Sequence, residues 1–257
     1  MPASDSASRE IALTLDVDWA PDWIIDSVAG RLVRAGVRAT WFATHLSPAI
    51  ARLQAAALFE VAPHPNFLSG SSHGDSPETV LRTVREWFPH ATAVRTHSLF
   101  QSERLMQLMT VHGFRVDCSL HLPQASHVVP HRLRFSTGGP WLTRVPHVFQ
   151  DNMHMLGGGE LGSDPLWLDT PGLKVMDFHP LHIALNSIDI SAYERLKAEA
   201  ELPRVQPQDI ARHVAKGFGI ACFFDAILER LQRGSSRTVS EIAGDLISGQ
   251  PGGTIYP

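Results

Sequence analysis

The chain has 257 residues, of which 44% are hydrophobic and 19% are charged, which is the composition of an ordinary globular protein that can bury a sizeable core. Its formal net charge is -4, and it has no long basic run. These values argue against a protein that binds nucleic acid or a membrane surface by charge. We expect its partner to be a small molecule or glycan bound at one site.

The two cysteines, Cys118 and Cys222, lie far apart and suggest neither a disulfide framework nor a thiolate metal site. Residues 1–10 lack the apolar core of a signal peptide, and no apolar run is long enough to span a bilayer. We therefore expect a cytoplasmic protein without a membrane span.

The first predicted element is a buried strand that begins with the apolar residues 11–13 and leads into Thr14-Leu15-Asp16-Val17-Asp18. Because side chains alternate faces along a strand, Asp16 and Asp18 should point the same way, roughly 6 to 7 Å apart. One site can then use both carboxylates. The alternative is a pair of loop residues that caps the next helix.

Strands and helices are predicted to alternate along the rest of the chain. Apolar spacing predicts a first helix over 23–33, which Gly36 ends. Further helices are predicted at 48–58, 77–88, 103–112, 207–217 and 221–233, and further strands at 38–44, 59–61, 91–95, 114–120, 141–145 and 172–178. This order, without linker or repeat, predicts one domain over 11–247 with a mostly parallel sheet, either a barrel or doubly wound. Residues 1–10 are expected to be a flexible N-terminus and 248–257 a tail.

Chemistry in such folds collects at the carboxyl ends of the strands, and these positions are rich in polar residues here. The residues concerned are Asp16, Asp18, His64, Asn66, Arg95, His97, Asp177, His179 and His182. Asp and His are ligands suited to zinc, iron, cobalt or nickel, and three protein ligands leave positions open for water and substrate.

We predict Asp18, His64 and His73 as the ligands of one divalent metal ion, with Zn2+ expected first and Co2+, Ni2+ or Fe2+ as alternatives. His73 ends the loop 69–74, whose small residues should let the backbone fold back toward His64. Alternatively, His73 is a solvent-exposed loop residue.

These motifs resemble those of the polysaccharide deacetylases, the NodB-homology group of carbohydrate esterases, whose fold is an irregular (β/α)7 barrel. The family's first motif, Thr-Phe-Asp-Asp, is similar to residues 14–18 with one residue inserted. By this resemblance Asp16 is the catalytic base and Asp18 a metal ligand. The second motif, His-Ser/Thr-x-x-His, matches at His64, but position 68 is Leu, so His73 is the nearest candidate for the second histidine.

The resemblance also implies roles for three later residues and covers about residues 11–247. Arg95 would orient the catalytic Asp, Asp151 would support that Arg, and His179, which ends a hydrophobic strand, would be the general acid. Several segments, among them Asp177-Phe-His-Pro-Leu-His-Ile183, look like a divergent WbmS-like branch associated with bacterial surface-polysaccharide biosynthesis.

The implied reaction is metal-assisted hydrolysis of an N-acetyl or N-formyl group on an amino sugar. The metal would activate the amide carbonyl and water, Asp16 would take a proton, and His179 would protonate the leaving amine. Five further residues are predicted to contact the substrate: Trp19, Asn66, His97, His182 and Asn186.

Each of these five residues also has another interpretation. Trp19 could belong to the core, while Asn66 could cap a turn and Asn186 could start a loop. His97 could contact the metal or bond to Asp151, and His182 could support His179.

Three other functions remain open at this point. A nucleotide-sugar glycosyltransferase would explain Asp16 and Asp18 but would leave the histidines unused. A related amidase could act on a cyclic ureide or imide, sometimes without metal. A binding protein could keep the pocket without turnover, and metal content at neutral pH would separate most of these alternatives.

Overall fold

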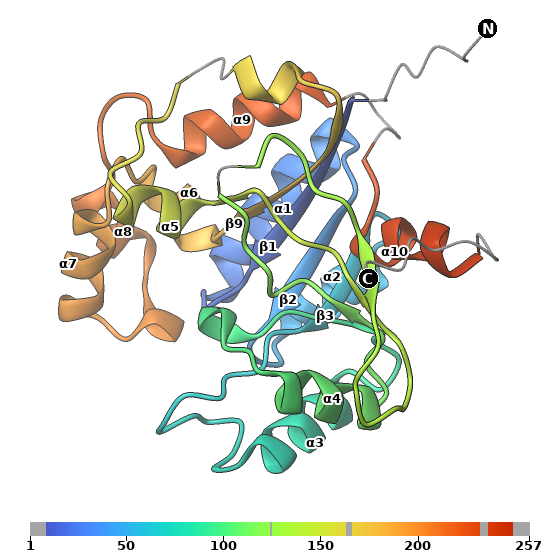
Figure 1. Cartoon of the computed structure of the whole chain (residues 1–257). Coiled ribbons are helices and arrows are strands. Elements are labelled where there is room, and N and C mark those ends of the chain that lie inside the picture. The colour runs from blue at the N-terminus through green and yellow to red at the C-terminus, as the bar shows by residue number, and fades with distance from the viewer. Residues whose placement is uncertain (1–8, 124, 163–165, 232–235, 249–257) are drawn as a thin grey trace, which may run out of the picture.

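Strand β1 (Arg9–Asp16) lies at the centre of a parallel sheet. The structure is a computed structural model that describes residues 9–123, 125–162, 166–231 and 236–248. The predicted N-terminal segment 1–10 and tail 248–257 therefore fall largely outside the described residues. This sheet has the order β3-β2-β1-β9-β8, with β2 at Ala39–Ala43, β3 at Phe59–Pro63, β8 at Phe149–Gln150 and β9 at Gly172–Phe178. Figure 1 labels β9, β1, β2 and β3 of this sheet.

A second sheet has the order β4-β5-β7-β6, with β4 at Ala93–Val94, β5 at Val116–Asp117, β6 at His131–Leu133 and β7 at Leu142–Arg144. Among the named strands of the described chain, only β6 and β7 pair antiparallel. The predicted mixed α/β fold with a mostly parallel sheet is therefore confirmed.

The two sheets are joined at both edges. Next to β3 and β4, the His97 N–H donates to the Pro65 carbonyl at 2.9 Å. At the other edge, the segment between β7 and β8 bonds to both sheets. The His147 N–H donates to the Leu120 carbonyl, which follows β5, at 2.9 Å. The Val148 N–H donates to the Val175 carbonyl in β9 at 2.9 Å. The strands thus close into an irregular barrel, one of the two arrangements predicted, and their carboxyl ends meet at one rim.

Helices follow most of the strands and cover the barrel (Figure 1). Their bounds are α1 Asp22–Ala35, α2 Pro48–Ala55, α3 Pro77–Trp87, α4 Glu103–Val111, α5 Asp151–Leu156, α6 Pro180–Leu185, α7 Ser191–Glu199, α8 Pro207–His213, α9 Ile220–Arg230 and α10 Val239–Ser248. Short 3-10 helices lie at His97–Leu99, Leu166–Asp169 and Leu202–Arg204.

Local sequence explains why α1 begins and ends where it does. Its apolar residues recur at helical spacing, and Ile24, Val28 and Leu32 are buried against the sheet. Gly36 follows in the left-handed conformation with φ 67°, which a glycine adopts without steric cost. In contrast, the sequence predicts no helix at α5, α6 or α7. The first two have only six residues each, and α7 buries only Ala192 and Leu196, so the apolar periodicity of these segments is weak.

The alternation of side chains along β1 separates an apolar layer from a polar barrel interior. Leu13 and Leu15 are fully buried in the main hydrophobic core. Thr14 and Asp16 point the other way and contact Arg95 inside the barrel. The apolar layer against the helices holds the barrel together, while its polar interior opens toward the rim.

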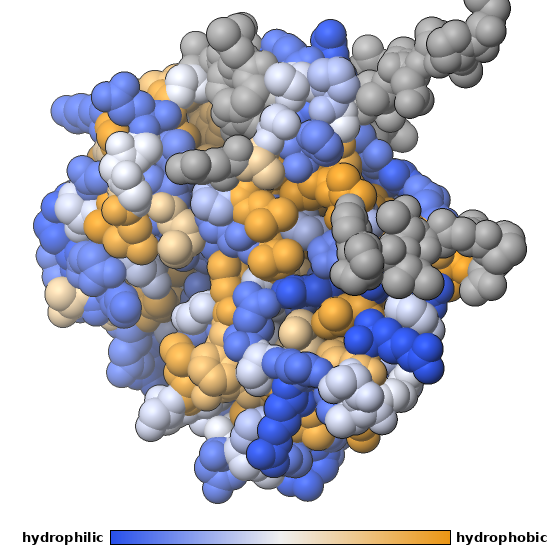
Figure 2. All heavy atoms as spheres, viewed as in Figure 1, coloured by the Kyte–Doolittle hydropathy of each residue, from blue (hydrophilic) through white to orange (hydrophobic). Residues whose placement is uncertain are grey.

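On the face seen in Figure 2, hydrophobic residues gather in a broken band down the middle, between hydrophilic borders. Among the described residues, the structure has no helix that combines the length and the apolar character needed to cross a membrane.

Candidate active site

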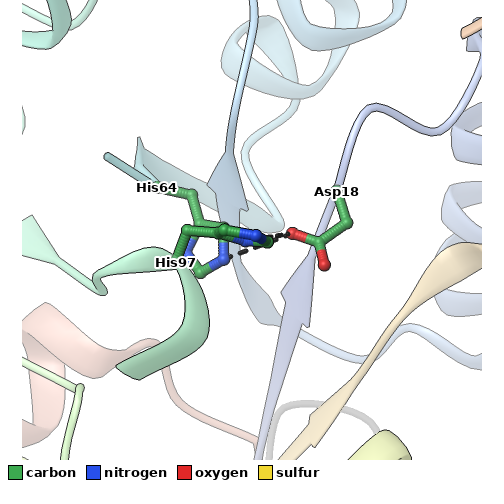
Figure 3. A group of neighbouring side chains, drawn as sticks. All are labelled: Asp18, His64 and His97. Carbon is green, nitrogen blue, oxygen red and sulfur yellow. Dashed lines mark hydrogen bonds and ion pairs between the residues drawn. The ribbon is translucent and has the colours of Figure 1, made fainter. Parts of the chain in front are cut away.

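Three side chains from the ends of β1, β3 and β4 converge at the barrel rim (Figure 3). Oδ1 of Asp18 lies 3.3 Å from Nε2 of His64 and 3.1 Å from Nδ1 of His97. The three potential ligand atoms all lie within 4.8 Å of one another. The carboxyl ends of three parallel strands therefore bring one carboxylate and two imidazoles to a common point.

Asp18 reaches this point through a tight turn rather than by continuing the strand. β1 ends at Asp16, and Asp18 and Trp19 have positive φ values of 43° and 57°. The Trp19 N–H donates to Oγ1 of Thr44 at 2.9 Å, which fixes the turn against the end of β2. Left-handed backbone at non-glycine residues costs roughly 1 to 2 kcal/mol each, a strain that is typical of functional sites.

The donor set fits a divalent metal ion. Nδ1 of His64 lies 2.8 Å from the Arg95 carbonyl and donates to it, which directs Nε2 toward Asp18. Burial by itself raises the pKa of Asp18, but the hydrogen bonds from His64 and His97 outweigh it and hold that pKa well below its ordinary value. One carboxylate oxygen and two imidazole nitrogens that converge in this way form an O/N donor set that suits zinc and similar metals.

His73 does not belong to this cluster, and its predicted role as third ligand requires correction. The Asn66 N–H donates to Nδ1 of His73 at 3.0 Å, and Nε2 donates to the Thr44 carbonyl at 2.7 Å. Both ring nitrogens are thus used by the backbone. His73 is buried rather than an exposed loop residue, and it fixes the loop after β3 to the end of β2. His97, predicted to contact metal or substrate, takes the third position.

Arg95 lies fully buried beneath this cluster and links two carboxylates. Its Nη1 donates to Oδ1 of Asp16 at 2.9 Å, to Oγ1 of Thr14 at 2.9 Å, and to Oδ1 of Asp177. Burial alone raises the pKa of Asp16, but the Arg95 guanidinium and the nearby His64 and His179 rings bring it below the ordinary value. Asp16 therefore stays ionised, and Arg95 holds one of its carboxylate oxygens.

Asp177 is a site residue to which the sequence prediction gave no role. It shares Arg95 with Asp16, and burial together with the Asp16 charge raises its pKa well above the ordinary value. The two carboxylates therefore differ in protonation, with Asp16 the one that ionises. The spacing of Asp177 and His179 was the available signal, because residues two apart on a strand share a face.

His179 lies on the opposite side of Asp18 from His64. Its Nε2 is 3.4 Å from Oδ2 of Asp18, and its Nδ1 is 2.5 Å from Oδ1 of Asp151. Burial disfavours the charged ring, but the charge and hydrogen bond of Asp151 outweigh it, and the pKa of His179 is raised well above the ordinary value. His179 is therefore a protonated acid at neutral pH.

Asp151 was predicted to support Arg95, and the structure corrects that role. Both of its carboxylate oxygens hold His179: one bonds the ring, and the other accepts the His179 backbone N–H at 2.7 Å. Arg95 is supported by Asp177 instead.

A small cavity of about 170 Å³ lies beside Asp18 and His179. His182 and Tyr193 line one side of it, and their rings are 4.9 Å apart. Burial lowers the pKa of His182 to about 4, so this ring is unprotonated at neutral pH. Its neighbour His179 is protonated at the same pH. The cavity has the size of a small acyl or hydroxyl-bearing group.

Of the remaining predicted substrate contacts, Trp19 lies at the rim, whereas Asn66 and Asn186 bond to the backbone of the protein itself. Trp19 lies at the rim, with its ring 5.2 Å from that of His97. The Asn66 side chain caps a turn by accepting from the Leu68 N–H at 3.0 Å. Asn186 ends α6 with φ 46° and bonds to the 215–222 segment, so its predicted substrate contact is corrected to a structural role.

Comparisons with known proteins identify the family of this chain. The sequence profile of a family described as "WbmS-like: Polysaccharide deacetylase" matches residues 13–197. The chain is similar to a crystal structure from Bordetella bronchiseptica described as a polysaccharide deacetylase involved in O-antigen biosynthesis, with 30% identity and a TM-score of 0.76 over 88% of this chain and 92% of that one.

Thermococcus litoralis 4-alpha-glucanotransferase is similar in fold alone, with 12% identity and a TM-score of 0.55 over 97% of this chain and 42% of that one. A search of the curated proteins found no match. The profile match and the 30% identical structure lead to the same conclusion: this chain belongs to the WbmS-like family of polysaccharide deacetylases.

Proposed function

We propose that this protein is a metal-dependent hydrolase that removes an N-acetyl or N-formyl group from an amino sugar in surface-polysaccharide biosynthesis. The observation that carries the proposal is the arrangement of three groups at one rim. Asp18, His64 and His97 converge there, with the Asp16–Arg95 pair and the Asp151–His179 pair beside them. The O-antigen role described for the B. bronchiseptica protein supports the choice of glycan.

Asp18, His64 and His97 would hold the metal, which we expect to be Zn2+, with Co2+, Ni2+ or Fe2+ able to replace it. When bound, such an ion supplies a Lewis acid that polarises an amide carbonyl and acidifies water. The side chains around it supply proton transfer and orientation.

Asp16 is the base in this proposal. Arg95 holds its Oδ1, so Oδ2 remains directed to the rim, 3.6 Å from Nε2 of His64. Because the pKa of Asp16 is low, the carboxylate is ionised at neutral pH and can take a proton from the attacking water. Thr14 and Asp177 fix Arg95 and hence the orientation of Asp16.

His179 is the acid. Asp151 fixes the ring through Nδ1, which leaves the Nε2–H directed at the rim near Asp18. A protonated imidazole there can give its proton to the amine as the C–N bond breaks. Base and acid then lie on separate elements around one reacting amide, as hydrolysis of this bond requires.

The small cavity beside His179, with a volume of about 170 Å³, has room for an acetyl or formyl group. Trp19 and His182 keep their predicted contacts with the sugar in this proposal. The expected cytoplasmic location stays a prediction.

The test is release of acetate or formate from N-acylated amino sugars by the metal-loaded protein, with the Asp16→Asn variant as matched control. Metal-dependent acetate or formate release that the variant lacks supports the proposal. Absence of release from monosaccharide, nucleotide-linked and oligosaccharide substrates, together with hydrolysis of a cyclic ureide or imide, would replace it with the alternative amidase.

A further inference from the structure

Tyr193 of α7 lines the same small cavity of about 170 Å³ as Asp18 and His179. It takes no part in the proton transfers of the proposed reaction. Its neighbours Ala192 and Leu196 are buried and anchor α7 to the protein. The helix therefore presents the Tyr193 side chain to the candidate active site from a fixed position.

Two side chains hold the Tyr193 ring in its orientation. The ring centroid lies 4.9 Å from that of His182, with an angle of 54° between the two planes. Within α7, Nζ of Lys197 lies 5.6 Å from the same centroid, which is within the range of a cation–π contact. A polar group held in this way needs little reorganisation when charge develops beside it, which is the condition for preorganised electrostatic stabilisation.

The hydroxyl of Tyr193 is available to a ligand. It forms no hydrogen bond within the described part of the chain, and its oxygen is not closed off from solvent. Burial raises the pKa of Tyr193, and the charge of Asp18 raises it further, more strongly than the charge of the adjacent Glu194 does. The hydroxyl therefore lies toward Asp18, and it keeps its proton as a hydrogen-bond donor at neutral pH.

The other polar side chains of this lining are carboxylates or already have a bond or a task. Asp18 and Glu194 accept hydrogen bonds when ionised. Asn152 accepts a backbone N–H of its own helix at 2.7 Å, and His182 bonds through Nδ1 to the hydroxyl of a buried serine at 3.1 Å. The N–H of His179 serves the leaving amine in the proposed reaction. Among the described lining residues, the Tyr193 hydroxyl is the donor left for the acyl oxygen.

Negative charge develops on the acyl oxygen of an amide as water adds to the carbon and a tetrahedral oxyanion forms. A hydrogen bond to this charged oxygen is stronger than one to the neutral carbonyl, so a fixed donor stabilises the transition state more than the bound substrate. We propose that the Tyr193 hydroxyl donates to the acyl oxygen and stabilises the tetrahedral oxyanion, a role that rests on the proposed amide hydrolysis. Tyr193 is then a catalytic residue supplied by α7.

The experiment compares zinc-loaded Tyr193→Phe with the wild type in two measurements. The first is release of acetate or formate from N-acylated amino sugars. We expect kcat to fall about 10- to 100-fold with little change in KM, because the lost interaction belongs to the transition state.

The second measurement is binding of the methylphosphonamidate of glucosamine, whose tetrahedral phosphorus and charged oxygen imitate the oxyanion without turnover. The affinity of Tyr193→Phe for this analogue should fall by the same factor as kcat/KM. Zinc content and urea unfolding should match the wild type, since the hydroxyl has no partner among the described residues. Arg195→Gln, at an exposed residue of α7 that does not line the cavity, is the matched control and should change neither measurement.

Unchanged affinity of Tyr193→Phe for the analogue overturns the proposal, as does a wild type that binds no analogue. A raised KM with kcat intact also overturns it, because Tyr193 would then bind the substrate and its transition state equally. Loss of zinc or of stability in Tyr193→Phe would replace the catalytic role with a structural one. If the wild type releases no acetate or formate but Tyr193→Phe still weakens analogue binding, only the proposed function fails.

Discussion

Nδ1 of His179 lies 2.5 Å from Oδ1 of Asp151, and the other oxygen of Asp151 accepts the His179 backbone N–H. The carboxylate thus fixes both the position of the ring and its tautomer, with Nε2 left for the substrate. The same contact raises the pKa of His179. One buried carboxylate therefore determines whether this histidine can act as an acid at neutral pH.

Replacing Asp151 by Asn should lower the pKa of His179 and with it the upper pH limit of activity. An acid works only when protonated, so activity is present below the pKa of His179 and is lost as the pH rises through it. In the variant this alkaline limb should move to lower pH, and kcat at neutral pH should fall at least about tenfold. The pH profile of kcat measures this, and an unmoved limb would show that Asp151 acts only in folding.

Asp16→Asn should remove most turnover and leave metal binding intact. The amide preserves the shape of the side chain but cannot take a proton, and loss of a general base typically costs about 10²- to 10⁴-fold in rate. Metal content and kcat of the purified variant measure the two effects separately. If near-full turnover were retained, Asp16 would not be the base.

Arg95→Leu should strongly destabilise the fold. The guanidinium is fully buried and bonds to both Asp16 and Asp177, so its removal leaves the ionised Asp16 buried without a cation and Asp177 without its donor. Breaking such a group typically costs about 3 to 5 kcal/mol of unfolding free energy. Urea unfolding measures the loss, with exposed Arg204→Leu as control. A loss below about 1 kcal/mol would contradict the account of Arg95.

The buried, unprotonated ring of His182 should make the folded protein less stable in mild acid. Its folded pKa of about 4 lies below the unfolded value of about 6.5, so the unfolded chain binds the proton first as the pH falls. Stability is therefore present above pH 6.5 and is lost between about 6.5 and 4, by about 2 kcal/mol at pH 5. Between pH 7 and 5, His182→Gln should lose about 2 kcal/mol less than the wild type. Equal losses in urea unfolding would contradict this assignment.

The sequence predicted the parts of the site that depend on strand ends. Asp16, Asp18, His64, Arg95 and His179 follow directly from a parallel sheet whose carboxyl ends share one rim. The same rule placed His97 near the site without giving it a single role.

The errors came from contacts that only tertiary structure decides. His73 and His97 are both loop histidines, and the Asn66 N–H and Thr44 carbonyl that use both nitrogens of His73 belong to other segments. Asp151 could have supported either Arg95 or His179, because β8 and α5 were not visible as separate elements. Spacing along the chain does not distinguish such partners.

We propose that Asp18, His64 and His97 together bind one divalent ion. His97→Ala should weaken metal binding beyond the roughly 10- to 100-fold that loss of an outer partner costs, whereas His73→Phe should leave the three ligands in place. The most direct measurement is a crystal structure of the zinc-loaded protein with anomalous scattering. We expect a single ion at about 2.0 to 2.2 Å from Asp18, His64 and His97. An ion bound by His73, or no ion at this cluster, would contradict the account.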